Sequence, residues 1–392
     1  MYARSSEKND GSIGMDKNIT VATMQFKNDV KVSTTEYLKT YYTFKLGDIA
    51  FEGHQSKEFR YGRFVENDIG NGIVSHIFAV FRPIQEYDLY FWKYAINNET
   101  LMQRILARST KASTMMHDLV TNDFLNETFL VPSVKEQKQI GAFLNKLDNL
   151  ITLHQRKCEE TKKLKKYMLQ KMFPQNGQTV PEIRFAGFTD AWEQRKLGDV
   201  LVSLQNNTLS RADLSNETGV AKNVHYGDVL IKFGEVLDVS KELLPMISDK
   251  SILIKYKTSF LQNGDVIIAD TAEDTTVGKC SEIVGLNDEV VLSGLHTIPY
   301  RPVEKFAPKY LGYYLNSDAY HNQLIPLMQG IKVTSISKSA MQDTDIIYPK
   351  SKEEQTEIGN YFDALDHLIT LHQHKYEQLQ SMKKFMLQNM FV

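Results

Sequence analysis

Two stretches of the chain combine basic side chains with short hydroxyl side chains. In residues 108–114 these are Arg108, Lys111, Ser113 and Thr114, and in residues 330–339 they are Lys332, Thr334, Ser335, Ser337 and Lys338. Such side chains suit contacts to phosphate oxygens and base edges, and Gly330 permits a close backbone approach. A capped surface loop has the same composition, so both interpretations stay open for each residue.

A second set of polar side chains suits the reading of base edges, because arginine pairs with guanine and asparagine with adenine in the major groove. The candidates are Arg60, Tyr61 and Arg63 in the first half of the chain and Asn206, Asn207, Ser210 and Arg211 in the second. These residue types do not define which bases would be read.

Signatures of catalysis are absent from the sequence. It holds no Asp/Asn/Ser-Pro-Pro-aromatic loop of an adenine methyltransferase, no G-x-x-x-x-G-K-S/T phosphate loop, and no G-x-S-x-G or H-E-x-x-H motif. The run Glu136–Lys138 could end a nuclease carboxylate–lysine motif. Its second copy, Glu354–Thr356, lacks the lysine, and both copies lie at a predicted helix start, so a capping role is favoured. We expect no catalytic residue and no metal site.

The composition fits a cytoplasmic protein of two or three domains. The chain has 392 residues, of which 42% are hydrophobic and 24% charged, and a formal net charge of −2. That charge argues against a general polyanion binder but allows local basic patches. The two cysteines, Cys158 and Cys280, exclude a disulfide framework. No apolar run approaches the roughly 18 residues needed to cross a bilayer, so no membrane partner is expected.

An internal repeat organises the elements that must position these side chains. Residues 136–173 align with residues 354–391 without a gap, and 21 of the 38 positions are identical. The block Leu150–Gln155 recurs letter for letter as Leu368–Gln373. The chain is therefore predicted to have four parts, which are a first globular block (1–132), a helix (133–173), a second globular block (174–349) and a second helix (350–392).

Apolar residues in both copies follow a 4-3-4-3 spacing for more than four heptads, which predicts long coiled-coil helices. The predicted helix or partner interface consists of Ile140, Leu144, Leu147, Ile151, His154, Met168, Met172, Phe173, Ile358, Phe362, Leu365, Ile369, His372, Met386, Met390 and Phe391. At His154 and His372, a hydrogen-bonded seam is favoured over a metal site or a pH switch. The methionines and phenylalanines at the helix ends suit either packing on the next domain or docking of a partner subunit.

Runs of β-branched and aromatic residues predict the strands of the globular blocks. They span residues 41–51, 72–82, 124–131, 229–233, 264–269, 290–298 and 346–348. Helical spacing predicts two short helices within residues 89–108 and an interrupted helix over residues 308–328. A lead-in segment, residues 181–200, opens the second block, and Phe188 and Trp192 are its predicted anchors.

The two blocks are predicted to be distant relatives. The matching pairs are Gly47-Asp48 with Gly264-Asp265 and Phe81-Arg82-Pro83 with Tyr300-Arg301-Pro302. On this alignment Met1 falls near Thr218. The first block is therefore either shortened at its N-terminus or has its lead-in supplied differently.

Three features of the sequence occur together in one protein family. They are the duplicated segment E-Q-x-x-I-G-x-F/Y-x-x-x-L-D-x-L-I, the lead-in PEIRFAGFTDAWEQRKLGD and the stretch IIADTAEDTTVGKC (Ile267–Cys280). With two diverged blocks alternating with two similar helices, the whole chain resembles the specificity subunit of Type I DNA restriction-modification enzymes. It departs from that pattern at the lead-in of the first block.

The resemblance implies an α+β fold in which two mixed α/β target-recognition domains are separated by a pair of long antiparallel coiled-coil helices, with a pseudo-twofold internal repeat. Each domain would read half of a split sequence in double-stranded DNA, and the helices would bind two modification (methyltransferase) subunits. Those subunits and added restriction subunits would bring S-adenosylmethionine, ATP and Mg. This chain would bind no cofactor and would be non-catalytic.

The helices are also predicted to act as a ruler. The first carries the chain from block one to block two and the second returns it, so they should lie antiparallel. Residues 135–171 hold ten basic and four acidic side chains, and residues 352–384 hold four and six, which favours their pairing. A 38-residue helix is about 57 Å long at roughly 1.5 Å per residue. Two such readers would engage DNA sites about one to one and a half turns apart.

Two rival functions remain open from the sequence. A coiled-coil adaptor that binds proteins but not DNA would show the same helices, and a duplex-binding assay distinguishes it. A self-contained DNA-modifying enzyme is disfavoured by the missing motifs, and cleavage or methyl transfer by the isolated chain would support it.

Overall fold

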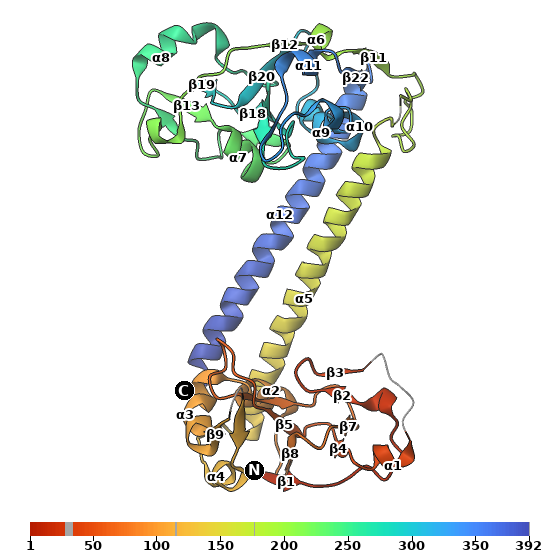
Figure 1. The fold of residues 1–392 in the computed structure, drawn as a ribbon, viewed down its shortest axis with the longest axis vertical. Coiled ribbons are helices and arrows are strands. Elements are labelled where there is room, and N and C mark those ends of the chain that lie inside the picture. The colour runs from red at the N-terminus through yellow and green to blue at the C-terminus, as the bar shows by residue number, and fades with distance from the viewer. Residues whose placement is uncertain (28–33, 114–115, 176, 392) are drawn as a thin grey trace. The chain divides into compact units, whose positions relative to one another are not determined.

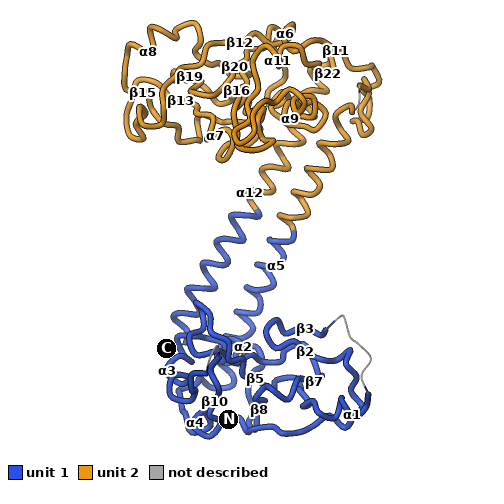
Figure 2. Tube along the Cα trace, viewed as in Figure 1, with its two compact units in different colours: residues 1–156, 372–392 blue, residues 157–371 orange. Residues whose placement is uncertain are grey.

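The chain forms two compact units in a computed structural model, which describes residues 1–27, 34–113, 116–175 and 177–391 (Figure 1). Unit 1 comprises residues 1–156 and 372–392, and unit 2 comprises residues 157–371 (Figure 2). Each unit holds one globular block together with part of each of two long helices. Among the described residues, no helix combines the length and hydropathy that crossing a bilayer requires.

The two long helices are α5 (Val134–Lys171) and α12 (Lys352–Asn389), each 38 residues long and unbroken between the units. Their starts are capped by serines, because the hydroxyls of Ser133 and Ser351 accept the backbone N–H three residues on, at 3.4 and 3.2 Å. The capping role predicted for the glutamates does not hold at Glu354, whose carboxylate accepts hydrogen bonds from Arg184 and Trp192. Within unit 1, Asp148 pairs with Lys383 while His154 meets His372, so the helices run antiparallel there.

Unit 1 is built on a four-stranded antiparallel sheet in the order β1-β8-β5-β6. The strands of this sheet are β1 (Tyr2–Ser5), β5 (Ile49–Glu52), β6 (Arg63–Glu66) and β8 (Ala79–Pro83). Paired smaller strands are β2 (Ile19–Thr20) with β3 (Gln25–Phe26), β4 (Tyr42–Phe44) with β7 (Gly72–Val74), and β9 (Thr110–Ala112) with β10 (His117–Leu119). The helices of the block are α1 (Thr35–Leu38), α2 (Leu89–Ile96), α3 (Glu99–Ser109) and α4 (Thr121–Asn126).

Unit 2 is built on a five-stranded sheet in the order β12-β20-β16-β18-β14. Its strands are β12 (Leu201–Ser203), β14 (Val236–Asp238), β16 (Val266–Ala269), β18 (Cys280–Val284) and β20 (Thr297–Pro302). The smaller sheets are formed by β13 (Ala221–Val224), β15 (Met246–Ile247) and β19 (Val291–Ser293), by β11 (Glu193–Lys196) with β22 (Asp345–Tyr348), and by β17 (Thr271–Ala272) with β21 (Thr334–Ser335). The helices of the block are α6 (Leu197–Val200), α7 (Tyr226–Ile231), α8 (Lys250–Lys255), α9 (Tyr310–Asn316), α10 (Asp318–His321) and α11 (Lys338–Gln342).

Each block packs on the helix pair through a continuous apolar core. In unit 1 the core includes Phe91 of α2, Leu144 and Leu147 of α5, and Leu379 and Phe391 at the end of α12. In unit 2, Met172 and Phe173 at the end of α5 join the start of α12 and the aromatic helix α9. The predicted α+β fold with two β-rich domains and two long helices packed together is therefore confirmed. The apolar helix ends pack on the domains, as one of the two interpretations held.

The sequence pairs that related the blocks form the same interaction in each unit. In unit 1, Arg82 donates two hydrogen bonds to Asp48, at 2.9 and 2.8 Å. In unit 2, Arg301 donates two to Asp265, at 2.9 and 2.7 Å. Asp48 and Asp265 are about 1% exposed, and a buried carboxylate needs such a bidentate partner. The Gly-Asp and Arg-Pro pairs are thus two halves of one fixed contact.

A three-residue contact joins each block to both long helices. In unit 1, the Tyr94 hydroxyl of α2 donates to Asp148 of α5 at 2.6 Å, and Lys383 of α12 pairs with the same carboxylate at 2.5 Å. The Lys383 ammonium also lies over the Tyr94 ring, 5.3 Å from its centroid. Burial and the neighbouring carboxylate raise the pKa of Tyr94, so its hydroxyl keeps the proton that it donates.

Unit 2 repeats this contact with the helices exchanged. The Tyr313 hydroxyl of α9 donates to Asp366 of α12 at 2.8 Å, and Lys165 of α5 pairs with Asp366 at 2.6 Å. Lys165 lies 5.3 Å from the centroid of the Tyr313 ring. Asp148 and Lys165 occupy the repeat positions of Asp366 and Lys383. We call each set of three the Tyr–Asp–Lys clamp.

Six predicted features differ from the structure. Residues 41–51 and 72–82 each form two strands in place of one, β4 with β5 and β7 with β8. Residues 229–233 fall largely in α7, where the His225 side chain caps the helix, and do not form a strand. Residues 290–298 split into β19 and β20 at His296, whose φ is 55°. Residues 127–131 follow the short helix α4 without strand pairing in the described part of the chain. Trp192 is buried as predicted, but Phe185 rather than Phe188 packs against the core.

The predicted match of Met1 with Thr218 is also wrong. Strand β1 pairs with β8 as β12 pairs with β20, so Tyr2 lies opposite Pro83 as Leu201 lies opposite Pro302. Residues 2–5 are therefore the counterpart of residues 201–203. The Arg-Pro motif, which occurs in both blocks, pairs with β1 in one unit and with β12 in the other and so relates these two strands. The loops that separate the strand from the motif differ in length between the blocks.

Glu66, at the end of β6, is a buried acidic residue of unit 1. It is 3% exposed, and neither carboxyl oxygen has a hydrogen-bond partner among the described residues. Burial raises the pKa of Glu66 to about 10, with a further contribution from Asp68. The folded state therefore holds a proton that the unfolded chain releases above its ordinary carboxyl pKa.

Glu66→Gln should remove a pH dependence of stability. Between the ordinary carboxyl pKa and about 10, the folded state binds the proton more tightly, so stability falls as pH rises. The variant should raise the Tm of unit 1 by at least about 4 °C at pH 8 and by little at pH 4.5. Calorimetry of both proteins from pH 4.5 to 9 measures this difference. A pH-independent difference would contradict a buried neutral Glu66.

Candidate functional site

In unit 2, the second basic and hydroxyl stretch is attached to the loop that follows β16. Asp270 directly follows β16, and Thr271 of β17 then pairs with Ser335 of β21. The Ile336 N–H donates to the Asp270 carbonyl at 2.9 Å, and the Thr334 hydroxyl donates to the carbonyl of Ala272 at 3.1 Å. The IIADTAEDTT stretch and residues 330–339 therefore form one surface at the end of the main sheet.

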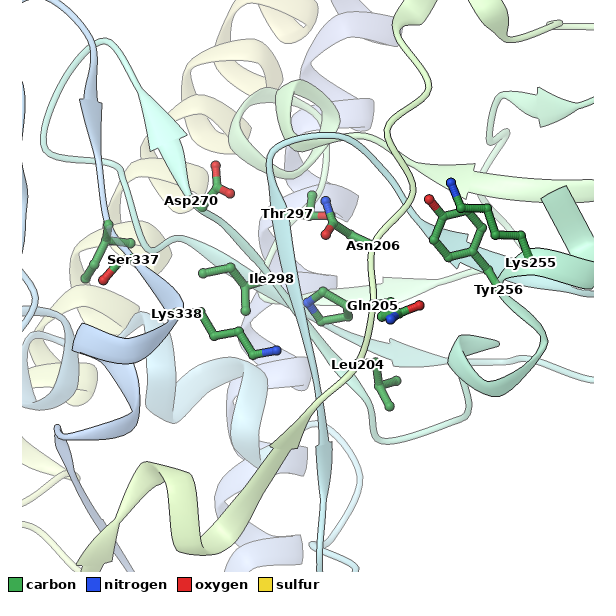
Figure 3. Close-up of a pocket in the computed structure, with 12 residues that line it drawn as sticks. Leu204, Gln205, Asn206, Lys255, Tyr256, Asp270, Thr297, Ile298, Ser337 and Lys338 are labelled. Atoms are coloured by element: carbon green, nitrogen blue, oxygen red, sulfur yellow. The ribbon is translucent and has the colours of Figure 1, made fainter.

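A pocket of about 470 Å³ opens beside this surface. Its polar lining comes from Gln205, Asn206, Lys255, Tyr256, Asp270, Ser337 and Lys338. Figure 3 shows Ser337 and Lys338 on one side of the segment that carries Gln205 and Asn206, with Lys255 and Tyr256 on the other. Three separate parts of the chain thus bring hydrogen-bond donors, two lysines and an aromatic ring to one cleft.

The structure distinguishes available side chains from structural ones in this stretch. Lys332, Ser335, Ser337 and Lys338 are exposed. Ser337 also caps α11 by accepting the Ala340 N–H at 3.1 Å, and the Thr334 hydroxyl is occupied by backbone carbonyls. Gly330 has φ 120°, and a Cβ there would lie 2.0 Å from the Val333 carbonyl. Glycine at this position is therefore required by the turn itself.

The asparagine and arginine candidates of unit 2 also include both accessible and structural side chains. Asn206 lines the pocket, whereas Asn207 is fully buried and donates to Asn223 and to the Ser293 carbonyl, at 2.7 and 2.9 Å. Direct contact of Asn207 with a nucleic acid is incompatible with this burial. Ser210 caps a short 3-10 helix with Asp213. The Arg211 guanidinium makes two hydrogen bonds with Asp228, at 2.8 and 2.6 Å.

Unit 1 presents the corresponding surface with different residues. His54, after β5, forms a β-bridge with Met116, as Thr271 after β16 pairs with Ser335. The hairpin of β9 and β10 therefore occupies the place of β21. Lys111 and Ser113 are exposed on it. Thr114 lies outside the described residues.

Two of the three predicted arginines of unit 1 pair with acids. Arg63 donates to Glu52 at 2.8 Å and to the Ala22 carbonyl, and Arg108 makes a bidentate pair with Glu127. Arg60 is exposed, and its guanidinium lies 5.5 Å from the centroid of the Tyr61 ring. Arg60 thus remains available. Tyr61 is half-buried, packs against the core and contacts the His117 ring, and Arg63 acts first as a structural residue.

Several residues that line the unit 2 pocket were not predicted. Lys255 ends α8 and Tyr256 follows it, 44 residues after Arg211 and 74 residues before Gly330, so no local signal points to them. Gln205 is the sequence neighbour of the predicted Asn206. Asp270 lies inside the IIADTAEDTT stretch. Those two could have been found from the sequence by extending each candidate run.

The predicted helix-interface residues are mainly turned inward. Leu144, Leu147, Met172, Phe173, Ile358, Phe362, Leu365 and Phe391 are buried, and Ile140, Ile151, Met168, Ile369, Met386 and Met390 are half-buried. His154 Nδ1 and His372 Nδ1 lie 3.0 Å apart. Among the described residues, no group of three or more His, Cys, Asp or Glu side chains is arranged to hold a metal ion.

Other apolar side chains of the helices are exposed, and they are repeated. Leu164 and Tyr167 of α5 are 44% and 49% exposed in unit 2. Their repeat equivalents, Met382 and Phe385 of α12, are 45% and 61% exposed in unit 1. Residues three apart lie on one face of a helix, so each unit carries the same exposed apolar pair. These pairs lie off the heptad seam, so the 4-3-4-3 spacing does not predict them.

A family model described as the Type I restriction modification DNA specificity domain matches residues 3–163 and 189–381. The chain belongs to this DNA specificity family. It is accordingly a specificity subunit, the non-catalytic DNA-recognition component of a Type I restriction-modification enzyme. The two matches coincide with the two halves of the internal repeat.

Comparisons with individual proteins agree with this assignment. The Type I restriction enzyme MjaVIII specificity subunit of Methanocaldococcus jannaschii is 26% identical over 303 residues, which cover 76% of this chain and 68% of that protein. The specificity subunit from M. genitalium has a TM-score of 0.52 at 13% identity, covering 100% of this chain and 93% of that one. A chain from a structure of Type I complex assembly and conformational transition has a TM-score of 0.50 at 16% identity, covering 100% and 97%. These structures share the fold of this specificity subunit.

Asn207→Ala should destabilise unit 2, because it leaves the buried Asn223 side-chain oxygen without its partner. It also removes one of the two hydrogen bonds to the Ser293 carbonyl, which keeps the bond from the Asn207 backbone N–H. We expect a loss of about 1–3 kcal/mol in the free energy of unfolding, measured by urea denaturation. Gln205→Ala is the matched control, since Gln205 is exposed two residues away. Equal stability of the two variants would show that the Asn207 network contributes nothing.

Proposed function

We propose that this specificity subunit recognises a bipartite target in double-stranded DNA, with one half-site read by each unit. The observation that carries the proposal is the repeated surface after the central strand. In unit 2 it joins β17 and β21, and in unit 1 it joins His54 to the hairpin of β9 and β10. Two copies of one surface, with different side chains, suit two different half-sites.

The side chains of these surfaces fit DNA contact. Lys332 and Lys338 in unit 2 and Lys111 in unit 1 are exposed and suit phosphate contacts, which set affinity and register. Gln205 and Asn206 lie inside the pocket and suit a base edge, because an amide offers both a donor and an acceptor. Arg211 and Arg108 could contact DNA only if they broke their ion pairs with Asp228 and Glu127.

The helices would set the distance between the half-sites. Each runs 38 residues without a break, and the Tyr–Asp–Lys clamps fix each block to both helices. Helix length would therefore determine how many base pairs stay unread.

Two modification subunits are the proposed partners on the helices, together with restriction subunits in the complete enzyme. S-adenosylmethionine, ATP and Mg would be bound by those subunits, in the cytoplasm. The repeated apolar pairs, Leu164 with Tyr167 and Met382 with Phe385, would provide two equivalent docking surfaces. Exposed apolar groups in repeated positions are typical of partner interfaces.

The function is tested by co-expression with a modification subunit, followed by methylome sequencing. We expect adenine methylation at a split motif with a fixed unread gap. A second LITL inserted after Leu153 adds about one helical turn and should lengthen the gap or abolish methylation, with the half-sites unchanged. Methylation at a short continuous site, or none with wild type, would contradict the proposal.

Tyr167→Glu and Phe385→Glu should each remove one modification subunit from the complex. A charge in the centre of an apolar interface costs several kcal/mol of binding, so a fall in affinity of at least about 30-fold is expected. Light scattering of the assembled complex counts the bound subunits. Lys163→Glu, on an exposed position of the same turn, is the matched control. If both variants still bound two modification subunits, the docking surface would have to lie outside these apolar pairs.

A further inference from the structure

Several polar side chains that line the unit 2 pocket are already bound within the fold. The Asn206 amide nitrogen donates to the Gly294 carbonyl at 3.1 Å, which leaves only its oxygen free. The Asp270 carboxylate accepts the Thr271 hydroxyl at 2.7 Å. The Ser337 hydroxyl accepts an N–H of α11 at 3.1 Å. A ligand in the pocket would have to compete with these contacts.

Gln205 differs from these residues because its amide is free. It is exposed at the pocket, and its side chain makes no hydrogen bond within the described part of the chain. An amide offers an acceptor oxygen and a donor nitrogen side by side, whereas an ammonium group offers donors alone. Gln205 can therefore present a paired donor and acceptor to a ligand without breaking any contact of the fold.

The backbone that carries Gln205 is fixed on both sides. The Leu204 N–H donates to the Pro299 carbonyl at 2.8 Å, and the Gln205 N–H donates to the Ser259 hydroxyl at 3.2 Å. On the other side, Asn207 is fully buried. A side chain that starts from an ordered backbone loses less freedom when it binds. The free amide is therefore held close to one position before any ligand arrives.

Two lysines flank this amide. Figure 3 shows Lys338 on one side of the segment that carries Gln205 and Lys255 on the other. Both lysines are exposed, and neither forms an ion pair with an acidic side chain that the structure describes. In duplex DNA the phosphates of the two strands border the major groove on both sides, and lysines suit contacts to them. An amide between two unpaired lysines thus fits a base edge between two rows of phosphates.

We propose that Gln205 reads an A·T base pair in the half-site that unit 2 recognises. On its major-groove edge adenine presents an acceptor, N7, beside a donor, the N6 amino group, and a glutamine amide matches both. Guanine presents two acceptors there, so an amide can satisfy only one of them. Lys255 and Lys338 bind the phosphates beside this base pair. The inference rests on the proposed function, because it assigns one base pair of the bipartite target.

The test compares Gln205→Ala with wild type, each co-expressed with a modification subunit, by methylome sequencing. We expect wild type to require an A·T pair at one position of one half-site. The variant should accept other base pairs there, with the preference lowered at least about 5-fold. The other half-site and the unread gap should stay unchanged. Gln205→Glu should change the preference at the same position to cytosine, because a carboxylate accepts from the cytosine amino group.

Two further variants separate base reading from other effects. Gln262→Ala is the matched control, because Gln262 is an exposed glutamine of unit 2 that does not line the pocket, and the motif should stay unchanged. Lys338→Ala should weaken binding to all sequences alike, as loss of a phosphate contact does. Fluorescence anisotropy titrations of the assembled complex measure both effects, with four duplexes that differ only at the assigned position.

Three results would overturn the assignment. They are an unchanged preference with Gln205→Ala in both measurements, a relaxed position that is a G·C pair in the wild-type motif, and equal relaxation with Gln262→Ala. In each case wild type would still methylate a split motif, so the proposed function would stand. A continuous or missing motif in wild type would contradict the proposed function itself, and the two failures are therefore distinct.

Discussion

The organisation of this protein depends on a half-buried carboxylate shared by a tyrosine and a lysine. Asp148 in unit 1 and Asp366 in unit 2 each accept a tyrosine hydroxyl from the globular block and a lysine from the opposite helix. Hydrogen bonds to a charged, partly desolvated group are stronger than those between neutral groups, so the three groups stabilise one another where they meet. One contact therefore fixes block, first helix and second helix at once.

The duplicated E-Q and I-G pairs extend this attachment. The Gln137 side chain accepts the Asp88 N–H at 3.2 Å, as Gln355 accepts the Ala307 N–H at 2.9 Å. A Cβ on Gly141 would lie 2.3 Å from the Asp88 carboxylate. The glutamine thus holds the block, and the glycine lets it approach the helix. The glutamine, which is identical in both copies, makes an equivalent contact in each unit.

The sequence predicted best what depends on short spacing. The helix bounds, the capping serines and the Gly-Asp and Arg-Pro pairs follow from local patterns, and all were found. The pocket in unit 2 was predicted only in part, because Lys255 and Tyr256 reach it from a distant element. Asn207 was misassigned because its type suits a base edge equally well as a buried amide network. Residues 127–131 read as a strand, but pairing needs a neighbour that the local sequence does not specify.

The Tyr–Asp–Lys clamp has a consequence for how such proteins diversify. Each block contributes one tyrosine to it, while both charged partners belong to the helices. A block from another protein can therefore replace a resident block if it keeps two groups. These are the tyrosine of the clamp and the backbone N–H that donates to the helix glutamine. The helices would not have to change. New recognition can thus arise by exchange of whole blocks, and mutations can accumulate in their outer loops without loosening the frame.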